Sequence, residues 1–510
     1  MSCISHYRRM PIPMTSTSPS TFDLTIRNGR ISNADRTFYA DVGIKDGVIV
    51  AIEDKLPAGE KDVDAQGMWV LPGGIDSHTH IEQLSGMGVM CADDFYSGTV
   101  SAAFGGTTTI LSFAAQHRKD RIPEVIADYS KRAKEKAVID YGFHLILSNP
   151  DEQALTHDLP EVIKNGITSL KVYMTYDALK LDDYQLLDVL SVAGEHGAMV
   201  MLHAENHDMI RWVARRLLER GHTAPKFHTV AHDALAETEA THRAITLSRL
   251  VDVPVLIVHV AGTETVEVIR NAHTLGASVY AESCPQYLFL EAKDTDLPGL
   301  EGAKFCCSPP PGDKASQEAI WQGFKDGTLS VYSSDHAPYK FDASGKLPKG
   351  DQTTFKEMAN GVPGIELRLP LLFSEGVMGG RLTIEEFVAL TATNHAHMYG
   401  LDPKKGTIAV GADADLVFWD PNRKVTVSAD MLHDQVGYTP YEGREITGWP
   451  VAVYSRGRCV VSDGKLHAER GSGEFVARQR PKPVTTHRTP AQSRGLFRTF
   501  VGMKAYSSPA

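Results

Sequence analysis

Two histidines and an aspartate alternate along a short apolar segment of the chain, in the stretch GGIDSHTH at residues 73–80. Because successive side chains of a β-strand point to opposite faces, Asp76, His78 and His80 are expected to project from one face. Imidazole nitrogens and carboxylate oxygens are the ligands that zinc and its neighbours in the first transition row prefer. The spacing therefore indicates a strand that could hold a metal ion.

Four other strand-like apolar segments also end in a histidine, an aspartate or a lysine. They are Lys171 in SLKVYM, His203 in MVMLHAEN, His259 in VLIVHVAG and Asp335 in SVYSSDHAP. Singly, each has an ordinary explanation, because a histidine on an apolar strand is often a hydrogen-bonded core residue and an aspartate after a strand often caps a helix. Together with His78 and His80 they supply more ligands than one four-coordinate ion needs. We therefore predict two metal ions that share a bridging group.

Lys171 is the residue on which this prediction depends most. An ammonium group inside a protein core and beside metal cations would carry a desolvation penalty of several kcal/mol, with repulsion in addition. A desolvated, neutral amine can instead react with carbon dioxide to give a carbamate, whose two oxygens could bridge two ions. The alternative is that Lys171 extends outward to solvent, because the alternation of Leu170, Lys171 and Val172 allows either face.

The residues between these motifs alternate short apolar strands with segments of helical periodicity, which is typical of βα units and a parallel sheet. Segments 182–197 and 316–327 are two such helices, each closed by a glycine. We expect eight strands, near residues 74–80, 107–113, 141–148, 167–174, 198–204, 253–260, 276–283 and 328–335. Eight units predict an α/β fold with a TIM-like (β/α)8 barrel, in which catalytic residues lie at the carboxyl ends of the strands.

Both ends of the chain have a different pattern. Short segments of alternating polarity, separated by turn signals, fill residues 22–72 and return in residues 400–470. They predict a small β-sandwich domain of antiparallel strands built from both chain ends, with the barrel over residues 73–399. Residues 1–21 are expected to be a disordered extension, with organelle targeting as the alternative. The basic C-terminal tail, residues 471–510, is expected to be disordered or to dock on an acidic neighbouring subunit.

The composition limits the classes of partner. The formal net charge of −11 gives no electrostatic footprint for nucleic acid, and no apolar run approaches the ~18–20 residues that a membrane span needs. We expect a small-molecule substrate. The six cysteines are scattered without a CxxC pair, which is typical of a reducing compartment and indicates a cytoplasmic protein. The long loop from His336 to Gly364 lacks periodicity and is expected to frame a site.

Seven motifs occur in an order typical of one enzyme family: GGIDSHTH, SLKVYMTY, LHAEN, VHVAG, CSPP, SSDHAP and NGVPGIE. Over residues 22 to about 470 the chain resembles the dihydropyrimidinase and hydantoinase branch of the cyclic amidohydrolases. The resemblance implies hydrolytic ring opening of a cyclic ureide, either a 5,6-dihydropyrimidine or a 5-substituted hydantoin, to an N-carbamoyl amino acid. It also implies two divalent cations per subunit, Zn²⁺ before Mn²⁺ or Co²⁺, carbon dioxide for lysine carboxylation, and a homotetramer.

The resemblance also implies a role for each residue of the set. The implied metal ligands are His78 and His80 for the more buried ion, His203 and His259 for the other ion, and carboxylated Lys171 as the bridge between them. Asp335 would bind the first ion and move the proton. Tyr176 would donate a hydrogen bond to the substrate carbonyl, and Ser308 and Asn360 would hold the cyclic amide largely through backbone groups. The alternative for these three is structural: Tyr176 packs, and Ser308 and Asn360 shape turns.

Departures from the family pattern leave the ring substituent and the stereochemical preference open. Relatives carry a different loop where this chain runs from Ile81 to Gly86, and CSPP continues here with Pro311 and Gly312. An imidase or an allantoinase is the alternative among enzymes, whereas a dihydroorotase is disfavoured because Glu82 would repel the carboxylate of its substrate. A non-catalytic scaffold of the same fold is disfavoured because all six ligand positions are filled.

Overall fold

Eight parallel strands form a nearly closed barrel in the computed structural model of the chain, which describes residues 21–481. Each strand pairs with its neighbours in sequence. The strands are β6 (Gly74–Thr79), β7 (Thr107–Ala115), β8 (Asp140–Ile146), β9 (Ser169–Tyr173), β10 (Met199–His203), β11 (Val255–Ile257), β12 (Val279–Ser283) and β13 (Val331–Tyr332). Beyond β13, His336 pairs with Thr79, and its carbonyl accepts a 2.8 Å hydrogen bond from the His80 amide. The (β/α)8 barrel and its eight expected strands are therefore confirmed.

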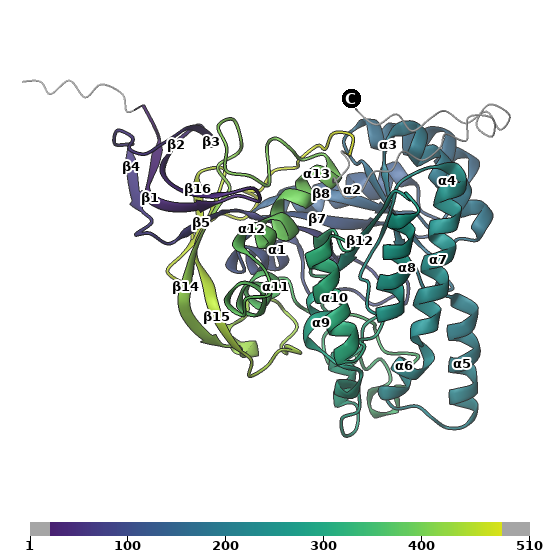
Figure 1. Cartoon of the computed structure of the whole chain (residues 1–510). Helices are drawn as coiled ribbons and strands as arrows, with labels where there is room; N and C mark the ends of the chain where they lie inside the picture. Colours follow the sequence, from purple (N-terminus) through teal and green to yellow (C-terminus); the bar gives the residue numbers. More distant parts are fainter. Residues whose placement is uncertain (1–20, 482–510) are drawn as a thin grey trace, which may run out of the picture.

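Most helices lie between the barrel strands in sequence and cover the barrel, several of them at the right in Figure 1, and the last three helices follow β13. They are α1 (Phe95–Phe104), α2 (Ile122–Lys136), α3 (Leu159–Lys164), α4 (Asp183–His196), α5 (His207–Glu219), α6 (Lys226–Ala231), α7 (Ala234–Val251), α8 (Thr263–Thr274), α9 (Pro285–Phe289), α10 (Lys314–Asp326), α11 (Arg368–Leu372), α12 (Ile384–Val388) and α13 (Asn394–Tyr399). The two helices expected from periodicity are α4 and α10. At the start of α4 the Asp182 side chain accepts from the Gln185 amide, and Gly197 ends the helix at φ +77°. Local capping chemistry thus sets both ends.

Both ends of the chain build a second sheet, which lies beside the barrel at the left in Figure 1. Its strands are β1 (Leu24–Ser32), β2 (Thr37–Lys45), β3 (Val48–Glu53), β4 (Lys61–Asp64), β5 (Trp69–Pro72), β14 (Leu416–Thr426), β15 (Glu445–Ser455), β16 (Arg458–Ser462) and β17 (Lys465–Leu466). Pairing of β5 with β14 joins the two ends. The sheet is mixed rather than purely antiparallel, because β1 runs parallel to β4 and β5. It packs around its own apolar core, which includes Ile26, Val42 and Phe418.

A buried lysine joins this domain to the barrel. Lys405 Nζ lies 2.6 Å from Asp140 at the start of β8, 2.9 Å from Asp413 and 2.7 Å from Asp415. Burial alone would lower the pKa of Lys405, but the three carboxylates outweigh burial and raise it. The three aspartates lie close enough together to suit a cation. The lysine ammonium supplies that positive charge, so the cluster is an ionic junction between domains.

The segment that follows the second sheet returns to the amino ends of the barrel strands. Phe475 pairs with Tyr141 of β8, and the buried Arg478 guanidinium donates a 2.7 Å hydrogen bond to the Ser169 hydroxyl at the start of β9. Residues 471–481 were expected to begin a tail that is disordered or docks on a neighbour. They instead pack on their own barrel, because Arg478 pairs with polar groups that the barrel buries there.

The predictions for the two termini fall mostly outside the described residues. Residues 1–20 and 482–510 carry nearly all of the expected N-terminal extension and most of the basic tail. Within residues 21–481, no helix is both long and apolar enough to cross a bilayer. The five cysteines of this range are all free thiols.

We expect Lys405→Met to destabilise the protein by about 3–5 kcal/mol, because methionine keeps the bulk of the side chain but removes the cation from the buried Asp140 and Asp415 and from the half-buried Asp413. Urea denaturation followed by fluorescence measures this change. Lys404→Met is the matched control, since Lys404 is exposed, and it should cost less than about 0.5 kcal/mol. Equal midpoints for the two variants would contradict this account of the junction.

Candidate metal centre and active site

Nine of the ten residues singled out from the sequence, all except Asp76, line one cavity at the carboxyl ends of the barrel strands. They are His78, His80, Lys171, Tyr176, His203, His259, Ser308, Asp335 and Asn360. The cavity has a volume of about 440 Å³. The long loop after β13 contributes Tyr339, Phe355 and Asn360 to its wall. The barrel thus brings together residues that lie far apart in the sequence, at the end where such barrels carry catalytic groups.

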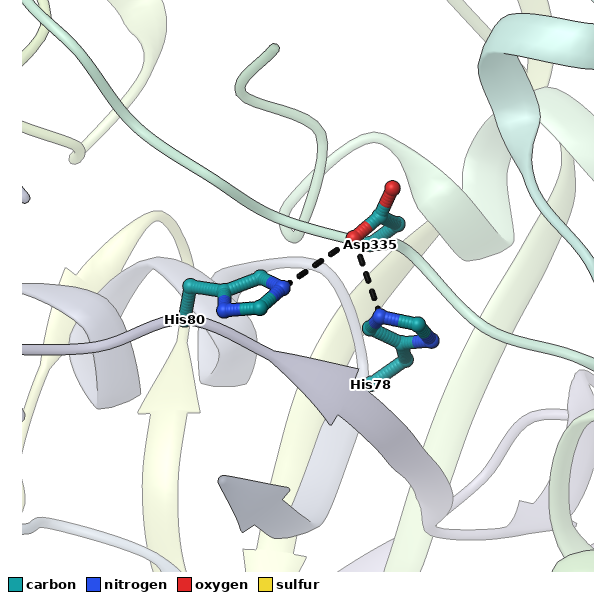
Figure 2. A group of neighbouring side chains, drawn as sticks. All are labelled: His78, His80 and Asp335. Atoms are coloured by element: carbon teal, nitrogen blue, oxygen red, sulfur yellow. Dashed lines mark ion pairs between the residues drawn. The ribbon is translucent and has the colours of Figure 1, made fainter. Parts of the chain in front are cut away.

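His78, His80 and Asp335 form the tightest group in this cavity, drawn in Figure 2. One oxygen of Asp335 lies 3.1 Å from His78 Nε2 and 3.3 Å from His80 Nε2. The other nitrogen of each ring is held from behind. His78 Nδ1 donates to Glu282 over 2.6 Å, and His80 Nδ1 donates to Gln83 over 2.8 Å. Each ring therefore directs Nε2 at the Asp335 oxygen.

The charges around this group favour a cation among its three facing atoms. Burial lowers the pKa of His80 below its ordinary value, so the neutral ring presents a lone pair at Nε2 to a carboxylate oxygen. Burial also acts to lower the pKa of His78, but the carboxylates of Glu282 and Asp335 outweigh it and raise that pKa. The His80 nitrogen and the Asp335 oxygen are therefore two acceptors that face each other. Such an arrangement is stable only with a positive charge between them. Imidazole nitrogen and carboxylate oxygen fit a divalent first-row ion.

A second pair of histidines enters the cavity from two neighbouring strands. His203 is the last residue of β10, and His259 follows β11. His203 Nδ1 lies 2.8 Å from His259 Nε2. Glu205 accepts a 2.7 Å hydrogen bond from His203 Nε2, which leaves Nδ1 as the ring atom with a free lone pair. Burial lowers the pKa of both rings, and neutral imidazole is the form that binds metal.

Lys171 points into the cavity from β9 and faces both histidine pairs. Its side chain is almost fully buried, and Nζ lies 3.3 Å from His78 Nε2. Its charge contributes to the lowered pKa of His203 and of His259. Burial lowers the pKa of Lys171 itself to about 8, so about a tenth of the amine is neutral at pH 7, far more than for an exposed lysine. Lys171 does not take the outward orientation that the sequence left open.

Tyr176, Ser308 and Asn360 lie together beside the second histidine pair. The rings of Tyr176 and His203 are 5.2 Å apart between centroids. Burial raises the pKa of the Tyr176 phenol, and hydrogen bonding with the side chains of Ser308 and Asn360 opposes this rise without cancelling it. Ser308 Oγ also lies 3.3 Å from His228 Nε2. The phenol therefore stays protonated and can donate a hydrogen bond into the cavity.

A model of the amidohydrolase family matches residues 69–460. The chain belongs to this family. The chain is 44% identical to the D-hydantoinase of Geobacillus stearothermophilus over 456 residues, which cover 89% of this chain and 96% of that protein. It is also similar to the crystal structure of dihydropyrimidinase from Brevibacillus agri NCHU1002, with 42% identity and a TM-score of 0.87 over 90% of this chain and 99% of the other.

The likeness extends to an L-hydantoinase (dihydropyrimidinase) from Arthrobacter aurescens, with 26% identity and a TM-score of 0.81 over 90% of this chain and 100% of the other. The resemblance drawn from the seven motifs is therefore confirmed. Membership of the amidohydrolase family, together with the His78, His80 and Asp335 group, supports the use of a binuclear metal centre.

Three residues of this amidohydrolase site have a left-handed backbone, which is uncommon for residues other than glycine. The φ angles are +68° at Tyr176, +42° at His259 and +48° at Asp335. Such conformations cost about 1–3 kcal/mol each and cluster at functional sites. Each one follows a barrel strand closely, so the turn redirects the side chain from the strand into the cavity.

Two buried glutamates of the site escaped the sequence reasoning. Glu282 of β12 accepts the hydrogen bond from His78 described above. Glu205 accepts from His203 with one oxygen and from His232 Nδ1, over 2.8 Å, with the other. The sequence carried a signal for each of these two glutamates. Glu282 is a lone carboxylate in an apolar strand, where a charge needs a partner, and Glu205 follows His203 by two positions in LHAEN.

Asp76 differs from the two histidines that follow it. Its carboxylate is fully buried and faces the Arg368 guanidinium at 3.5 Å. It also accepts a 3.1 Å hydrogen bond from the Ser334 amide, and it does not line the cavity. The interpretation of Asp76 as part of one ligand group with His78 and His80 is wrong. Alternation places the three on one face, but Asp76 lies deeper and neutralises a buried arginine.

We expect Glu282→Gln to weaken zinc binding by about 10–100-fold, because a neutral amide orients His78 less firmly and removes a negative charge behind it. Competition with a chelator measures the zinc affinity. Glu264→Gln, on the exposed side of α8, is the control and should bind zinc as the wild type does. Wild-type affinity in Glu282→Gln would remove Glu282 from the metal centre.

Proposed function

We propose that the protein opens cyclic ureides by hydrolysis, with a 5,6-dihydropyrimidine or a 5-substituted hydantoin as substrate and an N-carbamoyl amino acid as product. The observation that carries this proposal is the position of Lys171, a buried amine that faces four histidines in one cavity. The names of the relatives support the substrate class, since one is a D-hydantoinase and another a dihydropyrimidinase. A cavity of about 440 Å³ suits a small cyclic amide with a substituent.

Two divalent cations are the proposed cofactor, with Zn²⁺ favoured and Mn²⁺ or Co²⁺ as alternatives. The proposed ligands are His78, His80 and Asp335 for one ion, His203 and His259 for the other, and Lys171, carboxylated by carbon dioxide, for both. Carboxylation would turn a desolvated amine into an anion with two oxygen donors, which suits a place among four imidazoles. When bound, the cations would lower the pKa of a shared water and polarise the ring carbonyl.

Asp335 is the proposed carrier of the proton. Burial would raise its pKa, but the neighbouring histidines outweigh burial and hold the pKa well below its ordinary value. The group therefore begins as a carboxylate, with its second oxygen held by Gln286 Nε2 at 3.3 Å. It accepts the proton of the attacking water and delivers it to the ring nitrogen as the C–N bond breaks. The carbonyl carbon keeps the water oxygen, and the new carboxyl group releases its remaining proton to solvent and becomes the carboxylate of the product.

Tyr176 is the proposed donor to the carbonyl oxygen while negative charge grows there. Its raised pKa keeps the phenol protonated, and a fixed donor in a desolvated site acts most strongly on an oxygen that becomes charged. Ser308 and Asn360 adjoin this phenol and are proposed to hold the cyclic amide through their backbone groups. The three residues would then fix the ring with its carbonyl between the phenol and the metal centre.

A substrate panel separates this proposal from the neighbouring activities. We expect zinc-replete protein to open dihydrouracil or phenylhydantoin with a kcat/KM at least about tenfold above that for succinimide and allantoin. Succinimide lacks the second ring nitrogen that a ureide site would pair, and allantoin would have to bury its polar ureido substituent in the cavity. Both enantiomers of phenylhydantoin belong in the panel. Rapid turnover of succinimide or allantoin beside negligible turnover of the first two would assign an imidase or an allantoinase instead.

We expect Lys171→Ala to lose most of its bound metal and its activity, because the bridging anion is gone. Small carboxylic acids added together with zinc should restore part of the activity by occupying the vacated space. Metal analysis and turnover of the preferred substrate measure both effects. Lys164→Ala, at an exposed position of α3, should behave as the wild type. Normal turnover by Lys171→Ala would rule out the carbamate.

A further inference from the structure

Lys346 is fully buried, although it lies in the long loop after β13. Its ammonium donates two hydrogen bonds of 3.0 Å, one to the Cys306 carbonyl and one to the Ala359 carbonyl. Among residues 21–481 no ion pair joins Lys346 to a carboxylate, and the titratable side chains that interact with it are those of Cys306, Cys307 and His228. A buried cation held only by carbonyls is costly, which makes its position in the loop informative.

The two carbonyls belong to the two segments that carry proposed substrate-binding residues. Cys306 precedes Ser308 by two positions, and Ala359 immediately precedes Asn360. The Gly361 amide donates a 3.1 Å hydrogen bond to the same Cys306 carbonyl. The segments are thus joined directly by one backbone hydrogen bond and indirectly through the Lys346 ammonium.

The sequence around Lys346 builds a tight turn that directs its side chain inward. The Lys346 amide donates to the Lys340 carbonyl over 2.8 Å, and the Leu347 amide donates to the Asp342 carbonyl over 2.9 Å. A Cβ atom at Gly345 would lie 2.2 Å from the Lys340 carbonyl oxygen, so the turn needs glycine there. The direction of Lys346 is therefore set by the local backbone as well as by its two acceptors.

We propose that Lys346 is a positioning residue, which holds segments 306–308 and 359–361 at the separation that the cyclic amide requires. The inference rests on the proposed function, in which Ser308 and Asn360 hold the substrate. Lys346 does not line the cavity, whereas Ser308, Asn360 and Gly361 do, so it acts through the two carbonyls. Misplacement of such groups by about 1 Å is enough to weaken the fit of a substrate markedly.

Lys346→Met tests this role, because methionine keeps an unbranched side chain but donates no hydrogen bond. We expect KM for the preferred cyclic ureide to rise by about tenfold or more, with kcat lowered less than about threefold and with bound zinc unchanged. Lys349→Met is the matched control, since Lys349 is exposed and pairs with Glu357. A wild-type KM in Lys346→Met would overturn the inference.

Lys346→Gln separates the hydrogen bonds from the bulk of the side chain. Its amide keeps two N–H donors on a shorter, neutral side chain, so KM should lie between the values of the wild type and of Lys346→Met. A KM as high as that of the methionine variant would show that the two hydrogen bonds are not the cause.

Hydrogen exchange tests the same inference without any turnover. In Lys346→Met the amides of segments 306–308 and 359–361 should exchange faster than in the wild type, while those of α4 stay protected. Unchanged exchange in both segments, or faster exchange that includes α4, would overturn the positioning role. If the wild type opened no cyclic ureide, the proposed function would be wrong, and the exchange rates would still decide whether Lys346 clamps the two segments.

Discussion

Desolvation of the Lys171 amine is the constraint around which the interior of the barrel is arranged. The side chain is almost fully buried among four imidazoles, and this burial lowers its pKa to about 8. An ammonium is less favourable in such surroundings than in water, so they shift the amine toward its neutral form and favour a derivative that carries negative charge. The exclusion of water that disfavours the ammonium also strengthens the attraction between the carboxylates and a cation. Burial and ligand chemistry therefore act together.

Groups that lie behind the histidine rings determine much of the geometry of the cavity. Glu282 and Gln83 hold the rings of His78 and His80 from behind, and Glu205 does the same for His203. Each of these contacts fixes which ring nitrogen carries the proton and which one presents a lone pair. The centre is therefore assembled by hydrogen bonds from the neighbouring strands as well as by the residues at its surface.

Local signals made the barrel and most of the candidate site predictable from the sequence. Apolar strands that end in a polar residue mark the positions where the chain turns into the cavity, and His203 and Asp335 are examples. Alternation reveals which face a side chain occupies but not how deep it lies, which is why Asp76 was misassigned. It also carries no information on strand direction, so the parallel pairing of β1 with β4 and β5 was missed. The sequence does not distinguish Lys346 from a lysine of a surface loop. Both of its acceptors are backbone carbonyls, which every residue carries, and they belong to residues distant from it in the sequence.

The docking of Arg478 has a consequence for how the protein is made. Its guanidinium binds the Ser169 hydroxyl and the Phe143 carbonyl, groups that leave the ribosome about three hundred residues earlier. Strands β8 and β9 therefore emerge long before the guanidinium that completes the hydrogen bonding at this end of the barrel. This end of the barrel can be completed only after residue 478 has been made. Chains that stall before residue 478 would present this end of the barrel to chaperones and proteases.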